Sequence, residues 1–194
     1  MIEAAHRAGL DEIRHAQLCF ALASRYARAP VSPGQFPFGG DIAVEDDLAS
    51  LAARVVVEGC VGETIAAVHA REQLVRAVDP AVREVLRTIV EDESRHAELA
   101  FETVGWAIAI GGARVRAAVS AAFANALRAG PPGDDGNEAT LDLSVHGRLS
   151  TRERAEISIA VREEIVRPLA EALVGEHLAA HTTKPLVASS DLAT

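Results

Sequence analysis

Two short blocks of this sequence nearly repeat each other, and each pairs a glutamate with a histidine. The first block reads DEIRHAQL and the later one reads DESRHAEL. In each block the Glu and the His are three residues apart, so both side chains lie on one face of an α-helix. The two pairs, Glu12 with His15 and Glu93 with His96, indicate two half-sites that face each other around a pair of metal ions.

An apolar segment between the blocks carries further carboxylates that need partners. Its charged residues from position 51 to 68 are Arg54, Glu58 and Glu63. A helix that is apolar almost all round is surrounded by other helices. Because a buried carboxylate is costly unless it is paired or bound to a metal, cations are the natural partners of both glutamates.

The ligand types indicate which metal these helices would hold. Carboxylates can bridge two ions and an imidazole can bind each ion terminally, and oxygen and nitrogen ligands without thiolate suit iron or manganese. We expect two iron ions, with manganese as the alternative. A metal-bound histidine usually donates its other ring N–H to a carboxylate. We therefore expect Asp11 to orient His96, and Asp92 to orient His15, across the bundle.

The doubled Asp-Glu-x-Arg-His block resembles the ferritin-like di-iron carboxylate superfamily, above all its bacterial multicomponent monooxygenases. It is also similar to small bacterial ferritin-like proteins of unassigned activity. The resemblance covers about residues 3–110 and implies a glutamate roughly 30 to 35 residues before each block, on a neighbouring helix. Both Glu58 and Glu63 lie at such a distance before Glu93.

The choice between these two glutamates favours Glu58, because its neighbouring residues are closer to the family's local sequence. On a regular helix Glu63 points about 140° away from the Glu58 face. A π-bulge, which is common at functional sites, would bring Glu63 in as the ligand. We predict no catalytic residue beyond the metal ligands.

The resemblance also implies an earlier helix with one more glutamate, yet only eleven residues precede Glu12. Three explanations stay open. The sequence or the gene start is truncated, a partner supplies the helix, or the C-terminal helix fills the gap with Glu156, Glu163 or Glu164. Because an incomplete bundle would expose apolar surface, and such surface favours association, we expect a homodimer or a partner that supplies the missing helix.

Proline and glycine divide the chain into expected helices. Asp79-Pro80 predicts a helix start with Asp as N-cap and Pro at the first turn, and Gly111-Gly112 predicts a break. Ser150 and Glu153 have the spacing of a capping box, and Pro168 predicts a kink. We expect helices at about 3–28, 45–78, 80–110, 113–129 and 150–178.

These helices predict an all-α, ferritin-like but incomplete four-helix bundle. The expected units are a helical domain at 1–129, a loop at 130–149, a C-terminal helix at 150–181 that packs on the bundle, and a flexible tail at 182–194.

Composition and charge exclude several classes of partner. The net charge of −9, without a basic stripe, argues against nucleic acid or an anionic membrane surface. We see no apolar run long enough to span a bilayer and no signal peptide. Two cysteines are too few for a disulfide scaffold, so we expect a cytoplasmic protein.

The function that follows is a carboxylate-bridged di-iron protein that activates dioxygen, as an oxidase or hydroxylase of a substrate held in its apolar interior. One alternative is a ferroxidase or iron-binding ferritin-like protein without an organic substrate. The other is a truncated, metal-free relative.

Overall fold

The computed structural model describes residues 1–35, 46–130, 142–175 and 178, and within them the chain is all-helical, with no strand. The elements in chain order are α1 (Ile2–Ala27), α2 (Leu48–Val55), the π-helix η1 (Val56–Glu63), α3 (Thr64–Arg76), α4 (Pro80–Arg128), the 3₁₀ turn η2 (Ser144–His146), α5 (Thr151–Val161), the π-helix η3 (Arg162–Val166) and α6 (Arg167–Val174). The predicted tail at 182–194 and most of the predicted loop lie outside the described residues, and the division into domains stays a prediction.

The helix starts follow from capping residues that the sequence offers. The Asp79 side chain accepts a hydrogen bond from the Ala81 backbone N–H at 2.8 Å, with Pro80 in the first turn. Ser150 and Glu153 form the expected capping box at the start of α5. These side chains satisfy backbone N–H groups that a helix leaves without partners at its first turn.

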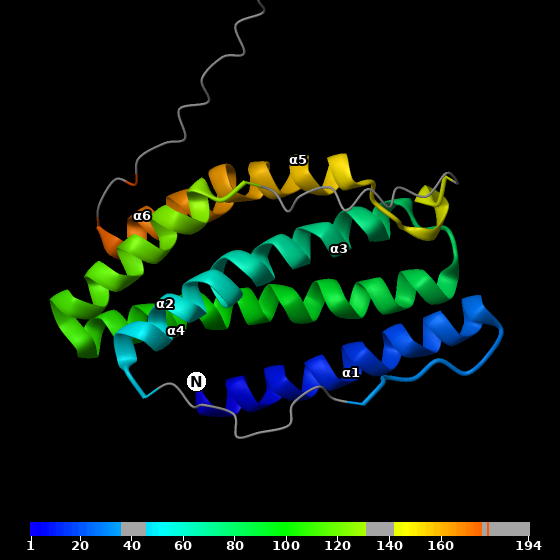
Figure 1. The fold of residues 1–194 in the computed structure, drawn as a ribbon, viewed down its shortest axis with the longest axis horizontal. Coiled ribbons are helices and arrows are strands. Elements are labelled where there is room, and N and C mark those ends of the chain that lie inside the picture. The colour runs from blue at the N-terminus through cyan, green and yellow to red at the C-terminus, as the bar shows by residue number, and fades with distance from the viewer. Residues whose placement is uncertain (36–45, 131–141, 176–177, 179–194) are drawn as a thin grey trace, which may run out of the picture.

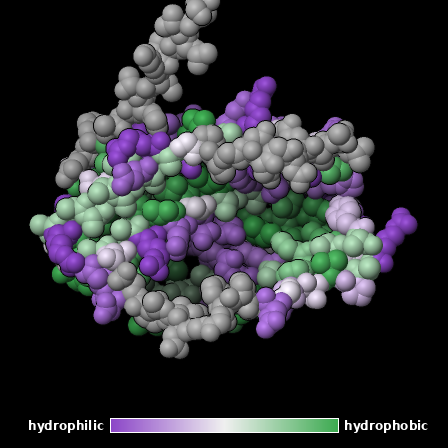
Figure 2. Space-filling model, viewed as in Figure 1, coloured by the Kyte–Doolittle hydropathy of each residue, from purple (hydrophilic) through white to green (hydrophobic). Residues whose placement is uncertain are grey.

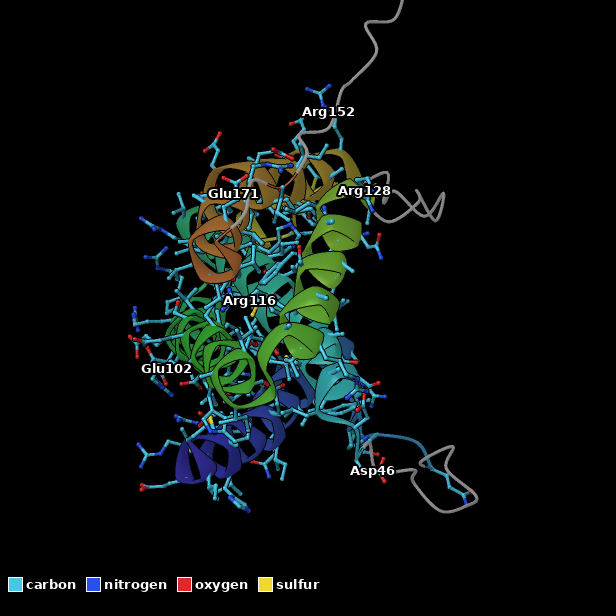
Figure 3. The ribbon with its side chains drawn as sticks, turned by 90° about the vertical axis from the view of Figure 1, so that its left-hand side faces the viewer. Asp46, Glu102, Arg116, Arg128, Arg152 and Glu171 are labelled. Carbon is cyan, nitrogen blue, oxygen red and sulfur yellow. The ribbon has the colours of Figure 1, made fainter. Side chains whose placement is uncertain are left out.

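The expected break near position 111 is a sharp turn inside α4. Gly112 has φ 61° and ψ −146°, a conformation that glycine adopts without strain. The segment after it turns away from the first part of α4 and lies beside α6, where Arg116 donates to the Val174 carbonyl at 2.8 Å. Figure 3 shows this segment from the side. The first part of α4, before this turn, carries the second block.

The helices lie in layers around α4 (Figure 1). The rod formed by α2, η1 and α3 packs along α4, α1 lies antiparallel to α4, and α5 and α6 cover the side opposite α1. The larger core cluster lies between the rod, α4 and the C-terminal helices, and its fully buried members include Val56, Cys60, Val104, Phe123 and Val166. Figure 2 shows hydrophilic side chains gathered along the line where α1 meets α4.

Helix α4 is long enough to cross a bilayer and contains an 18-residue window with a mean hydropathy of 1.3. The expectation that no segment has such a composition is therefore wrong for this helix. Composition alone does not distinguish a span from the central helix of a folded domain, and a third of this window is buried against the other helices. The cytoplasmic location stays a prediction.

Candidate metal centre

The two Glu-x-x-His turns meet where α1 lies against α4. His15, Glu93 and His96 are all buried, and the two imidazole rings lie 6.1 Å apart. Each ring turns its Nδ1 atom toward Glu93, at 3.4 Å from Oε1 for His15 and 3.4 Å from Oε2 for His96. Oε1 of Glu12 lies 3.2 Å from His96 Nδ1 and 3.7 Å from His15 Nδ1. Both carboxylates therefore lie between the two rings.

The outer nitrogen of each ring faces an aspartate of the other helix. Nε2 of His15 lies 2.9 Å from Asp92 Oδ2, and Nε2 of His96 lies 3.4 Å from Asp11 Oδ2. A carboxylate only accepts hydrogen bonds when it is ionised, so each aspartate places the ring proton on Nε2. The lone pair of each Nδ1 then points at the two glutamates, the arrangement that a metal-bound histidine has.

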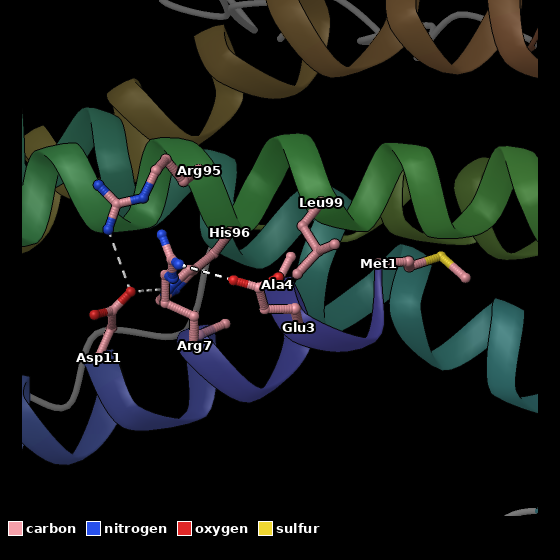
Figure 4. A pocket seen from close by; sticks show the side chains of 9 residues that line it. Met1, Glu3, Ala4, Arg7, Asp11, Arg95, His96 and Leu99 are labelled. Carbon is pink, nitrogen blue, oxygen red and sulfur yellow. Dashed lines mark hydrogen bonds and ion pairs between the residues drawn. The ribbon is translucent and has the colours of Figure 1, made fainter.

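One arginine joins the two aspartates. Arg95 donates from Nη2 to Asp11 Oδ2 at 3.2 Å and to Asp92 Oδ1, and Figure 4 shows Arg95, Asp11 and His96 pointing toward one another. The pocket in that view has a volume of about 300 Å³. It lies on the outer side of His96, and its lining residues are Met1, Glu3, Ala4, Arg7, Ala8, Asp11, Arg95, His96 and Leu99.

The structure separates the two glutamates of the middle rod. Glu58 is exposed, and no described interaction joins it to the cluster. Glu63 is half-buried and shares a hydrogen bond with Glu93. Both residues lie in the π-helix η1, whose wider turns change the direction of every side chain that follows relative to a regular helix. Glu63, the alternative that required a π-bulge, is the glutamate brought to the cluster.

The C-terminal helix brings none of its three candidate acids to the cluster. Glu156 pairs with Arg152 within α5, and Glu163 of η3 pairs with Arg167 at the start of α6. Glu164 lines a separate pocket between α3 and α5. Within the described residues, the C-terminal helix therefore does not replace the absent glutamate.

Burial and like charges favour protons on the inner acids. Burial raises the pKa of Glu63 to about 8, helped by the hydrogen bond to Glu93 and by the charges of Glu93 and Glu12. Burial also raises the pKa of Glu93. At Asp92 burial acts in the same direction, but hydrogen bonds from His15 and Arg95 outweigh it and lower the pKa. Among the described residues, the outer Asp92 has the Arg95 guanidinium beside it, whereas neither inner acid is paired with an arginine or lysine.

The donor set fits a hard divalent cation. Ligand atoms of Glu12, Glu93 and His96 lie within 4.8 Å of one another. Oε2 of Glu93 is buried and accepts no hydrogen bond from the described residues. A buried carboxylate oxygen without a partner is costly, and a metal ion at this point would satisfy it. Oxygen and nitrogen atoms without sulfur are the ligands that iron and manganese prefer.

The chain matches no known protein-family model, no curated protein and no solved structure. The geometry of the site is therefore the basis for its function.

Proposed function

We propose that the chain is a ferritin-like protein that binds two iron ions, with manganese as the alternative, and activates dioxygen as an oxidase or hydroxylase. The observation that carries the proposal is the convergence of two buried histidines, each with Nδ1 turned toward Glu12 and Glu93 and Nε2 held by an aspartate. An accidental cluster would not need the same orientation twice.

Each residue has a definite part in this proposal. His15 and His96 would each hold one ion through Nδ1, and Glu12 and Glu93, whose carboxylates lie near both rings, would help to hold both ions. Glu63 would lose its proton to become a further ligand when the positive charge arrives. Reduced iron bound there would supply the electrons that dioxygen accepts. The aspartates and Arg95 would keep both imidazoles in the ligating tautomer throughout.

A ferroxidase is the second candidate, and one observation favours it. The side chain of Glu12 is 56% exposed although it touches both histidines. An exposed carboxylate at the edge of the centre gives ferrous ions a route from solvent.

The third alternative, a metal-free relative, has less support, because both half-sites retain their complete Glu, His and Asp sets. We also propose that the chain forms a homodimer, or binds a partner, through α1. Most of this helix is exposed, and its apolar residues Leu10 and Ile13 are 67% and 57% exposed.

The test is metal analysis of protein purified without oxygen, followed by exposure to ferrous iron and air. Two irons per chain would support the dinuclear centre, and an iron content near zero after loading would contradict it. Oxidation of many ferrous ions per chain, without an organic substrate, would favour the ferroxidase. The exchange Glu93→Gln should abolish iron retention, whereas Glu58→Gln, on the exposed side of the rod, should leave it unchanged.

A further inference from the structure

The two histidines of the cluster have unequal numbers of acidic neighbours. The carboxylates of Glu12 and Glu93 each lie within 3.7 Å of Nδ1 of both rings. Glu63 is the one additional inner carboxylate among the described residues. It shares a hydrogen bond with Glu93 and lies close enough to His96 for the two side chains to interact electrostatically. Glu63 therefore adds a third carboxylate beside Glu93, on the side where His96 acts on it.

The geometry of the ligand atoms has the same asymmetry. Within the described residues, one group has all its ligand atoms mutually within 4.8 Å, and it contains His96 with Glu12 and Glu93 but neither His15 nor Glu63. The buried oxygen without a hydrogen bond, Oε2 of Glu93, is the one that faces His96 Nδ1 at 3.4 Å. An ion beside His96 would satisfy this oxygen, whereas an ion beside His15 would meet Oε1 of the same carboxylate.

The hydrogen bonds to the two aspartates favour the His15 position instead. The His15–Asp92 contact of 2.9 Å is shorter than the His96–Asp11 contact of 3.4 Å, so His15 is the more firmly oriented ring. An outer partner of this kind is worth about 10- to 100-fold in metal affinity when it is removed altogether. Here both partners are present and differ only in distance. The closer set of ligand atoms beside His96 and the unsatisfied Oε2 of Glu93 outweigh that difference.

We propose that the two metal positions are unequal and fill in order. The first ion binds beside His96, held by Glu12, Glu93 and Glu63, and the second binds more weakly beside His15, sharing Glu12 and Glu93. This inference rests on the proposed dinuclear centre. It assigns the tight position to the second sequence block, although the two blocks are nearly identical in sequence.

The experiment is an anaerobic titration of the metal-free full chain with Co²⁺ alone, followed by calorimetry and by the visible absorption of bound cobalt. We expect two binding steps of one ion each, and the first ion should bind at least about tenfold more tightly than the second. This lower limit is the effect of removing the hydrogen-bond partner of a metal-bound histidine. His15→Ala should remove the weak step and keep the tight one. His96→Ala, the matched exchange in the other block, should remove the tight step.

Two further variants separate a lost ligand from a lost fold. Glu63→Gln keeps the side chain's shape and should bring the two steps close together, while Glu58→Gln in the same π-helix should leave both unchanged. Circular dichroism of each metal-free variant would verify that the helices remain. Two equal steps in the native chain, or loss of the tight step in His15→Ala, would overturn the order of filling while the dinuclear centre stands. Absence of any cobalt binding would overturn both.

Discussion

Nε2 of His15 lies 2.9 Å from Asp92 Oδ2, across the contact between α1 and α4. The same ring faces Glu93 with its other nitrogen at 3.4 Å. Neutral imidazole carries one proton, and a proton held toward Asp92 leaves the Nδ1 lone pair free for a cation. The aspartate of one block therefore determines whether the histidine of the other block can act as a ligand.

Exchange of Asp92 for asparagine tests this dependence. Asparagine keeps the shape but removes the charge that attracts the His15 proton, so we expect metal affinity at the His15 position to fall by about 10- to 100-fold. Titration with Co²⁺ measures the change. The neighbouring exposed Glu91→Gln is the control, and an affinity unchanged in both variants would contradict the proposed role of Asp92.

Arg95 and Arg14 hold the same place in the two blocks but differ in their surroundings. Arg95 contacts both Asp11 and Asp92, whereas Arg14 is exposed. We expect Arg95→Ala to lower metal affinity about tenfold through loosened histidines, and to change stability by about 1 kcal/mol or less because the arginine is half exposed. Arg14→Ala should change neither quantity. Equal effects of the two exchanges on cobalt binding would refute the bridging role of Arg95.

Gly59 lets the π-helix approach α4. A Cβ atom at this position would lie 2.5 Å from the Ala100 Cβ, so Gly59→Ala should destabilise the protein by about 1–3 kcal/mol, the usual cost of overpacking. Urea unfolding measures this. Adding Ala100→Gly should recover part of the loss by removing the clash. Gly9→Ala in α1, where a Cβ meets open space, should instead stabilise by about 0.5–1 kcal/mol.

The raised pKa of Glu63 makes the metal-free protein sensitive to pH. Since this pKa rises from 4.5 to about 8 on folding, the folded chain binds more protons than the unfolded chain between these values. The contribution of Glu63 to stability is therefore complete below pH 4.5 and is lost as the pH rises through about 8. Thermal unfolding of the metal-free protein should show a fall over this range that Glu63→Gln reduces. An identical pH profile in the two proteins would disprove the shift.

Association through α1 is open to direct measurement. Leu10 and Ile13 are largely exposed on this helix, and covering them would remove apolar surface from water. We expect a dimer in sedimentation at micromolar protein, and a monomer after Leu10→Lys with Ile13→Lys. A native monomer under these conditions would contradict the homodimer.

Much of the fold could be predicted from the sequence, because its signals are local. Asp79-Pro80, the Ser150 capping box and the Gly112 break each act through backbone groups a few residues away. The direction of the two Glu-x-x-His turns follows from helical spacing alone. The ferritin-like bundle as a whole stays a prediction, since the described residues establish only an all-helical chain.

The glutamate of the middle rod could not be predicted in the same way. The choice between Glu58 and Glu63 depends on how the helix turns between them, and a π-helix occupies Val56–Glu63. The spacing of a regular α-helix therefore favours Glu58, which is exposed in the structure. Gly59, which lies next to Glu58, does not by itself indicate how the helix turns. Its missing Cβ matters only once Ala100 is known to lie against it, which is a contact between residues far apart in the chain.

The attachment of α1 to the rest of the chain is largely polar. His15 is its one buried residue within the described part, and the larger core cluster contains no residue of α1. Ions bound by both turns would crosslink α1 to α4, and loss of these ions would allow α1 to detach from α4. Release of the metal and uncovering of the interior would then be a single event, so iron content would set how tightly the first helix closes over the molecule.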